Sequence, residues 1–180
     1  MRWRPGNGTS AQFGFAGLLL LCLVSAAAQD RVMSVASDEG SVIVMPGGLS
    51  TLQGAMVDGI NLSVGLEGEF RVYRAVFRGE THVAHVAVEG PQRHMAFDPA
   101  QARFREVLPS LLVELDDHSR LNEVVEAVGG VSGKSYEQLG FAIVRLPDTA
   151  NPGEAAQILQ SHAAVTAVQV QLSRPLRVPL

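Results

Sequence analysis

Five histidines and one pair of adjacent aspartates are the residues of this 180-residue chain whose types could support chemistry. His82 and His85 are three positions apart in a segment with strand alternation, so their side chains point to opposite faces and cannot hold one metal ion together. The other three occupy separate predicted elements, at His94, His118 and His162. We therefore expect neither a metal site nor a cofactor.

Acid-base or nucleophilic catalysis has equally little support in the sequence. Asp116 and Asp117 stand directly before a helical pattern, where carboxylates usually cap the helix and interact with its dipole. The chain has no G-x-S-x-G elbow, and the glycines within 129–133 lack the Lys-Ser/Thr of a phosphate-binding loop. The single cysteine, Cys22, lies in an N-terminal apolar stretch. We predict a protein that is not an enzyme.

The first 28 residues have the pattern of a secretory signal peptide. Arg2 and Arg4 give a positive start, and an uncharged apolar stretch follows at 13–24, shorter than the roughly 20 residues that a membrane span needs. Three alanines at 26–28 offer the small side chains of a cleavage site. Cleavage after the third alanine is the expectation, and an uncleaved anchor is the alternative. The exported chain would be periplasmic or secreted, without membrane attachment.

Charge excludes nucleic acid as a partner. The chain has 14 Lys and Arg against 18 Asp and Glu, and the 14 basic residues become 12 once Arg2 and Arg4 are removed with the signal peptide, which takes the formal charge from −4 to −6. No lysine or arginine run occurs, so the cationic surface that dominates sequence-independent nucleic-acid binding is missing. The apolar fraction of 47% is enough to build a core.

Residues 29–98 read as a small antiparallel β module, because short alternating segments are bounded by glycine and proline. The predicted strands lie at 41–45, 60–64, 70–77 and 81–88. Pro91 and the Asp98-Pro99 pair then interrupt the pattern, so we expect residues 99–109 to form a linker or a short helix.

Residues 110–172 alternate between strand and helix periods in the order β-α-β-β-α-β. The strand patterns lie at 111–115, 131–136, 140–146 and 166–172. The apolar residues of the first helix have i, i+3, i+4, i+7 spacing, at Leu121, Val124, Val125 and Val128. The second helix begins with Asn151 as N-cap, Pro152 at the first helical position and Glu154 at the capping-box position. Its predicted buried residues are Ala155, Ile158, Leu159 and Ala163.

This order predicts the α+β class, with a C-terminal ferredoxin-like βαββαβ domain preceded by the small antiparallel β module. We expect residues 110–180 to fold without that module. The architecture serves ligand sensors, metal carriers, RNA binders and protease inhibitors, so it does not decide the function. RNA binding is disfavoured because Tyr136 and Phe141 are the only aromatic residues on the four predicted strands.

The last eight residues, 173–180, cannot be helical. Pro175 and Pro179 remove two backbone donors and fix φ near −65°, which favours an extended tail. Apolar side chains alternate along it, at Leu176, Val178 and Leu180, as in a peptide that lies in a groove and offers side chains to pockets. A frayed terminus is the alternative.

The C-terminal region resembles the end of subtilisin-family propeptides. The similarity rests on the run 139–146 (LGFAIVRL), on Ile158-Leu159 and on the run 164–169 (AVTAVQ), which matches a V-x-x-V-E strand. In that family a strand, a helix and such a strand precede the tail that lies in the protease cleft. A signal peptide, a Gly-rich β module and a propeptide-like domain without a protease domain together resemble the free-standing external chaperones of Aeromonas-type subtilases.

The resemblance implies a secreted chaperone and inhibitor of a subtilisin-like serine protease. In the family the sheet packs on two surface helices of the protease and the tail occupies the non-primed subsites like a product. Carried over, Leu180 would lie nearest the catalytic serine, with Pro179, Val178 and Arg177 in successive subsites behind it. Leu176 belongs to the same protease-binding tail.

Two features depart from the family. Gln169 and Gln171 stand where many members have acidic residues that cap helices of the protease, so hydrogen bonding remains but the charge is lost. The tail after Gln171 is also a few residues longer than in typical propeptides, which could shift the subsite register. The alternative function is an exported small-ligand-binding or assembly module with a ferredoxin-like sheet.

Overall fold

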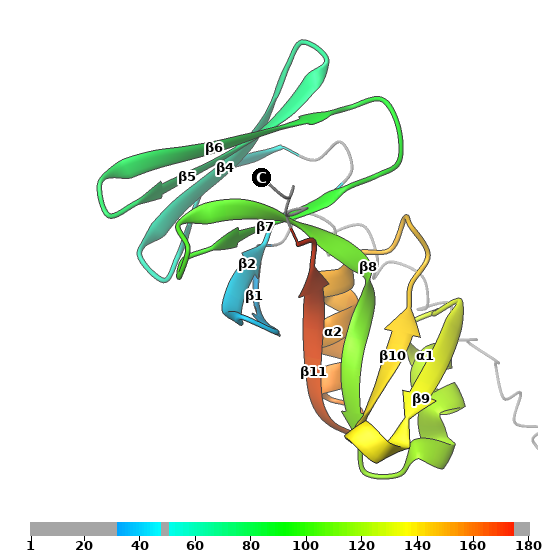
Figure 1. Cartoon of the computed structure of the whole chain (residues 1–180). Coiled ribbons are helices and arrows are strands. Elements are labelled where there is room, and N and C mark those ends of the chain that lie inside the picture. Colours follow the sequence, from blue (N-terminus) through cyan, green and yellow to red (C-terminus); the bar gives the residue numbers. More distant parts are fainter. Residues whose placement is uncertain (1–31, 48–50, 175–180) are drawn as a thin grey trace, which may run out of the picture.

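The computed structural model describes residues 32–47 and 51–174. Strands make up 54% of it and helices 16% (Figure 1). The strands are β1 (Met33–Ser37), β2 (Gly40–Val44), β3 (Leu52–Val57), β4 (Ile60–Glu67), β5 (Phe70–Phe77), β6 (Glu80–Ala87), β7 (His94–Asp98), β8 (Arg103–Leu115), β9 (Ser132–Tyr136), β10 (Phe141–Arg145) and β11 (Val165–Leu172). The helices are α1 (Leu121–Ala127) and α2 (Pro152–Gln160), with 3-10 turns η1 (His118–Arg120) and η2 (Glu137–Leu139).

The strands form two sheets. Four consecutive strands, β3 to β6, make an antiparallel meander. The other sheet has the order β11-β1-β2-β7-β8-β10-β9, and β8 also pairs with β11. That additional pairing closes β11, β1, β2, β7 and β8 into a five-stranded barrel, from which β10 and β9 extend. Only the β1–β11 pair of the barrel is parallel, with Ser37 opposite Val170.

The predicted ferredoxin-like βαββαβ domain preceded by a separate β module is therefore wrong. The strands and helices after residue 110 do follow the order β-α-β-β-α-β, but their sheet does not end at β11. Strand β1 pairs with the edge of β11 that a four-stranded sheet would leave open, and β2 and β7 complete the barrel. An open edge exposes unpaired backbone groups, and closure removes them.

Residues 99–109 form neither a linker nor a short helix. Asp98 Oδ1 accepts backbone hydrogen bonds from Ala100 and Gln101, at 3.0 and 3.2 Å, and Ala102 has a φ of +50°. The chain therefore turns back after Asp98 into β8, which pairs first with β7 and farther along with β10 and β11. A proline-containing turn of this kind joins two paired strands rather than two domains.

The β2–β7 pair is buried on both faces, so it belongs to two hydrophobic cores. Val42 and Val44 lie in the core beneath α1 and α2. Ile43 and Met45 lie in the second core, between this pair and the meander β3 to β6. Phe97 of β7 joins the second core and is fully buried. The meander therefore packs on the barrel through the β2–β7 pair, whose two faces contribute to the two cores.

The predicted N-caps Asp117 and Asn151 are present, whereas Glu154 contacts the Asn151 side chain, whose Nδ2 donates to Glu154 Oε1 at 3.5 Å, instead of the backbone N–H that a capping box requires. Asp117 Oδ1 caps η1 by accepting a hydrogen bond from the Ser119 backbone at 2.9 Å. Asn151 Oδ1 caps α2 by accepting from the Gly153 backbone at 3.0 Å. The apolar face of α1 packs on the core, and Gly129 ends the helix with a left-handed φ of +59°.

Two of the four residues predicted on the buried face of α2 are exposed. Ala155 and Leu159 are buried, whereas Ile158 is 49% exposed and Ala163 also faces solvent. The helix packs on β1 as well as on β8 and β11, which brings Ala156 rather than Ile158 against the core.

Candidate functional site

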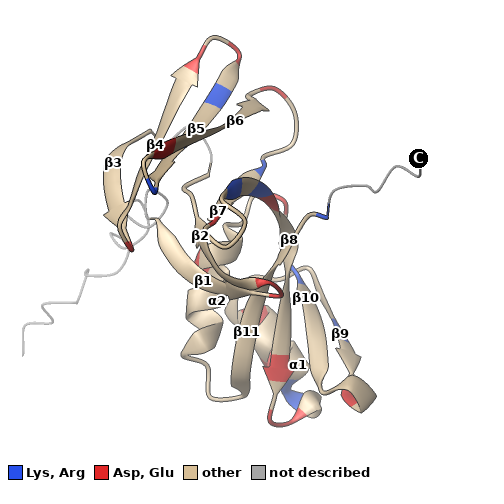
Figure 2. Ribbon diagram, turned by 60° about the vertical axis from the view of Figure 1, so that its left-hand side comes forward, with Lys and Arg blue, Asp and Glu red and all other residues tan. Residues whose placement is uncertain are grey.

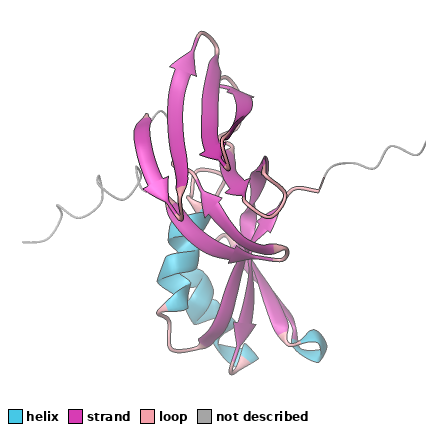
Figure 3. Ribbon diagram, turned by 90° about the vertical axis from the view of Figure 1, so that its left-hand side faces the viewer, coloured by secondary structure: helices cyan, strands magenta, loops and turns pink. Residues whose placement is uncertain are grey.

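The sheet β9-β10-β8-β11 has both helices on one side (Figure 3). Alternate residues of its strands point into the core beneath these helices, among them Val113, Val144 and Val168. The intervening residues point to the other side, which we call the open face. It consists of Ser110, Leu112, Glu114, Ser132, Lys134, Tyr136, Phe141, Ile143, Arg145, Ala167, Gln169 and Gln171.

One row of the open face runs across all four strands. The strand registers place Lys134 opposite Ile143, Ile143 opposite Leu112, and Leu112 opposite Gln169. At one end of the face, Tyr136 and Phe141 lie with ring centroids 5.2 Å apart. The face is therefore apolar at its centre, at Leu112 and Ile143, and polar or charged along β11 and at the outer positions of β8, a mixed composition suited to contact with another protein.

The structure places both predicted glutamines on this face. Gln169 and Gln171 are half-buried on β11, and their neighbours Val168 and Val170 point into the core. The Gln171 side-chain carbonyl accepts a short hydrogen bond from the Ser110 hydroxyl of β8. Gln171 is thus held in place by its own sheet, and no such contact is recorded for the Gln169 side chain within the described residues.

The C-terminal end of β11 is fixed by two backbone contacts. The Ser173 backbone N–H donates to the Glu106 carbonyl at 2.8 Å, and the Ser173 carbonyl accepts from Arg105 Nη2 at 2.9 Å. The predicted tail contacts lie beyond this point, outside the described residues: Leu176, Arg177, Val178, Pro179 and Leu180.

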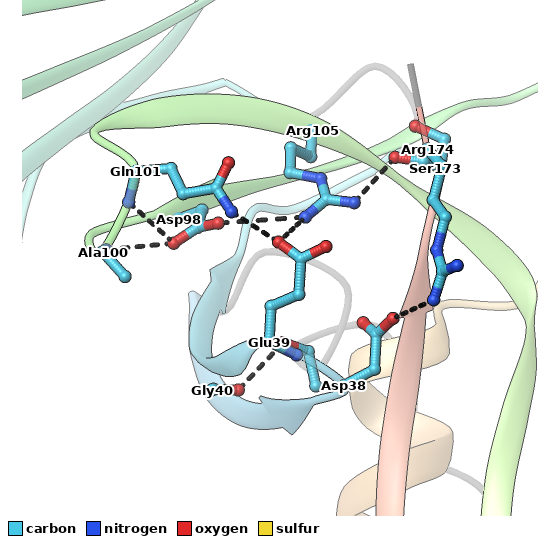
Figure 4. A network of polar contacts seen from close by, with 10 residues as sticks. Asp38, Glu39, Gly40, Asp98, Ala100, Gln101, Arg105, Ser173 and Arg174 are labelled. Carbon is cyan, nitrogen blue, oxygen red and sulfur yellow. Dashed lines mark hydrogen bonds and ion pairs between the residues drawn. The ribbon is translucent and has the colours of Figure 1, made fainter. Parts of the chain in front are cut away.

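A charged network surrounds this end of β11 (Figure 4). Arg105 Nη1 forms a short ion pair with Glu39 and lies 3.9 Å from Asp98 Oδ2. Arg174 Nη2 lies 3.5 Å from Asp38 Oδ2. Figure 2 shows residues of both signs close together where β7 and β8 meet the end of β11. Sequence reasoning missed this network, because its members come from segments more than sixty residues apart.

The five histidines occupy five different environments. His82 lies against the Phe97 ring at 5.6 Å and His85 against Phe70 at 6.2 Å, on opposite faces of β6. His118 Nδ1 and the Ser135 hydroxyl are 2.7 Å apart. The remaining two are His162, whose Nδ1 accepts from the Ala164 backbone, and His94.

His94 on β7 is the most unusual of the five. It is 3% exposed, and neither ring nitrogen has a hydrogen-bond partner among the residues described. Gly47 packs so closely that a Cβ there would lie 2.4 Å from His94 Cε1. Burial, and then the charge of Arg71, lower the pKa of His94 to about 4. It is a neutral core residue at pH 7.

Neither a metal site nor a membrane helix is found in residues 32–47 and 51–174. No group of three or more His, Cys, Asp or Glu side chains there could hold a metal ion. Neither helix has the length and apolar content for crossing a bilayer. Asp117, the remaining catalytic candidate with Asp116, acts as a cap, and its hydrogen bonds with Ser119 lower its pKa.

Comparison with known proteins identifies the region that contains the open face. Residues 107–171 match the family model described as the fervidolysin N-terminal prodomain. No curated protein matches the chain, and no solved structure does. The match supports a subtilase prodomain-like domain, which is a non-catalytic, regulatory kind of domain associated with a subtilase-type protease. It begins at Val107, where β8 passes from its pairing with β7 to its pairing with β11.

Proposed function

We propose that this chain is an exported chaperone and inhibitor of a subtilisin-like serine protease. The observation that carries the proposal is the prodomain match over 107–171, which covers β9, β10, β11 and most of β8 and so includes nearly the whole open face. We therefore expect this region to act on a subtilase-type protease.

The open face is the larger of two proposed contact surfaces. Its apolar middle, Leu112 and Ile143, would pack on surface helices of the protease. Both side chains are already half-buried in the free protein, so each would contribute less than the roughly 1.5–3 kcal/mol of a side chain buried from full exposure. Gln169 and Gln171 would hydrogen-bond to the ends of those helices. Because both are neutral, the contribution of charge to a helix dipole is absent.

The tail is the second proposed surface, and it would block catalysis. Residues Leu176, Arg177, Val178, Pro179 and Leu180 would occupy the substrate cleft, so that inhibition follows from competition with substrate. Chaperoning follows from the same binding, since a ligand that binds the native protease and not its unfolded chain stabilises the native form. If the bound surface also forms in the folding transition state, refolding is accelerated.

The test is binding and inhibition by the full exported chain, residues 29–180, against subtilisin-like proteases from the same genome. We expect tight inhibition of at least one protease and a higher yield when that protease is refolded with the chain present. Leu112→Asp should weaken binding more than a hundredfold, because it buries an unpaired charge in the contact. Asn61→Asp, an exposed position on β4, is the matched control. Absence of binding to every such protease would refute the proposal.

A further inference from the structure

We infer that Arg105 is a positioning residue that aims the C-terminal tail, and that the strands before residue 107 serve the inhibitory site by holding this arginine. The inference rests on the proposed function, and it assigns a role to the part of the chain that the prodomain match does not cover.

Arg105 joins three segments of the chain with one guanidinium group. Its side chain is only 4% exposed. Nη2 donates to the Ser173 carbonyl at 2.9 Å, and Nη1 pairs with Glu39 in the β1–β2 turn. Asp98, at the end of β7, lies on the same side, 3.9 Å from Nη1 (Figure 4).

The partner carboxylates are themselves held in place. Glu39 Oε2 also accepts from Gln101 Nε2 at 2.6 Å, and the Glu39 backbone N–H donates to the Ser37 hydroxyl at 3.3 Å. Asp98 Oδ1 is occupied by the turn that it caps. Because each partner has its own anchor, the guanidinium has a fixed orientation toward Ser173.

The network determines the direction in which the chain continues after the end of β11. Strand β11 ends at Leu172, and Ser173 is held on one side by the Glu106 carbonyl and on the other by Arg105. Arg174, the last residue that the structure describes, lies 3.5 Å from Asp38 in the same turn. Ser173 and Arg174, the two residues that follow the last core side chain Leu172, are thereby held in place before the tail begins.

This arrangement would reduce the entropy lost when the tail enters a cleft. Fixing the backbone of a residue costs conformational entropy, and residues already ordered in the free protein do not incur that cost on binding. Arginine suits the task, since its planar fork binds a carbonyl and a carboxylate at once.

The test is a double-mutant cycle between Arg105→Lys and deletion of residues 175–180. Lysine keeps a positive charge beside Glu39 and the buried Asp98, but a single ammonium group cannot reproduce the fork. Binding of the full exported chain is measured to the protease with its catalytic serine replaced by alanine. Arg74→Lys, which changes an ion pair with Glu67 in the meander, is the matched control.

We expect Arg105→Lys to weaken binding about tenfold in the full chain and less than twofold in the chain without residues 175–180. Glu39→Gln, which loosens the same guanidinium, should show the same dependence on the tail. Equal losses with and without the tail would mean that Arg105 is merely structural, and no loss in either would also overturn the inference. If deletion of the tail has no effect on binding, the proposed role of the tail is wrong. If no protease binds, the proposed function as a whole is wrong. In either case this inference is wrong as well.

Discussion

Acid should destabilise the protein through His94. The side chain is buried, and its pKa of about 4 lies well below the ordinary histidine value of 6.5. A group whose pKa is lowered by folding takes up protons in the unfolded chain first, so stability falls as the pH drops from 6.5 toward 4 and is unaffected by this group above 6.5. The gap between the two pKa values corresponds to roughly 3 kcal/mol.

The assay is urea unfolding of the wild type and of His94→Phe at several pH values between 7 and 4. Carboxylates also titrate in this range, so the informative quantity is the difference in unfolding free energy between the two proteins. We expect that difference to shift by roughly 3 kcal/mol in favour of the variant as the pH falls. His85→Phe, which removes an exposed histidine of β6, is the matched control. If the wild type and His94→Phe lose stability in parallel, the burial argument is wrong.

Three further predictions concern the tail, the packing of α1 and the unity of the fold. Deleting residues 177–180 should leave the thermal midpoint within about a degree and weaken protease inhibition at least tenfold, as inhibition constants will show. Gly133→Ala should lower the unfolding free energy by about 1–3 kcal/mol, because its Cβ would lie 2.7 Å from Val125 Cγ2, whereas Gly65→Ala, with open space around it, should be nearly neutral in the same melts. A fragment of residues 110–180 should show no cooperative unfolding in calorimetry, because β1, β2 and β7 supply part of its core. This result would be contrary to the expectation from sequence, and a sharp transition would contradict the prediction.

Local patterns in the sequence predicted where strands and helices lie better than which strands pair with one another. Alternation located β4, β5 and β6, and the Asn151-Pro152 pair located the start of α2. Strands β1, β3 and β7 were missed, because they are short or flanked by turn residues. The barrel was missed because it depends on one parallel pairing between Ser37 and Val170, which no local pattern specifies.

The candidate site likewise has one part that local sequence patterns predicted and one part that they did not. Alternation along β11 was sufficient to place Gln169 and Gln171 on the side opposite the core. Arg105 could not have been found, because a basic residue in a predicted linker gives no sign of burial. Its importance arises from Glu39 and Ser173, which only the closed barrel brings together. The roles of Gln169, Gln171 and residues 176–180 in protease binding stay predictions.

Strand β8 gives the molecule a mechanical property. It is continuous over 13 residues, about 40 Å at the usual rise of a strand. One end is hydrogen-bonded to β7 in the barrel, and the other end lies between β10 and β11 in the sheet that bears the open face. A partner that pulls or tilts that sheet must therefore either bend β8, which breaks backbone pairing on one side, or rotate the barrel with it. The barrel and the sheet that bears the open face are thereby joined through one continuous strand (Figure 1).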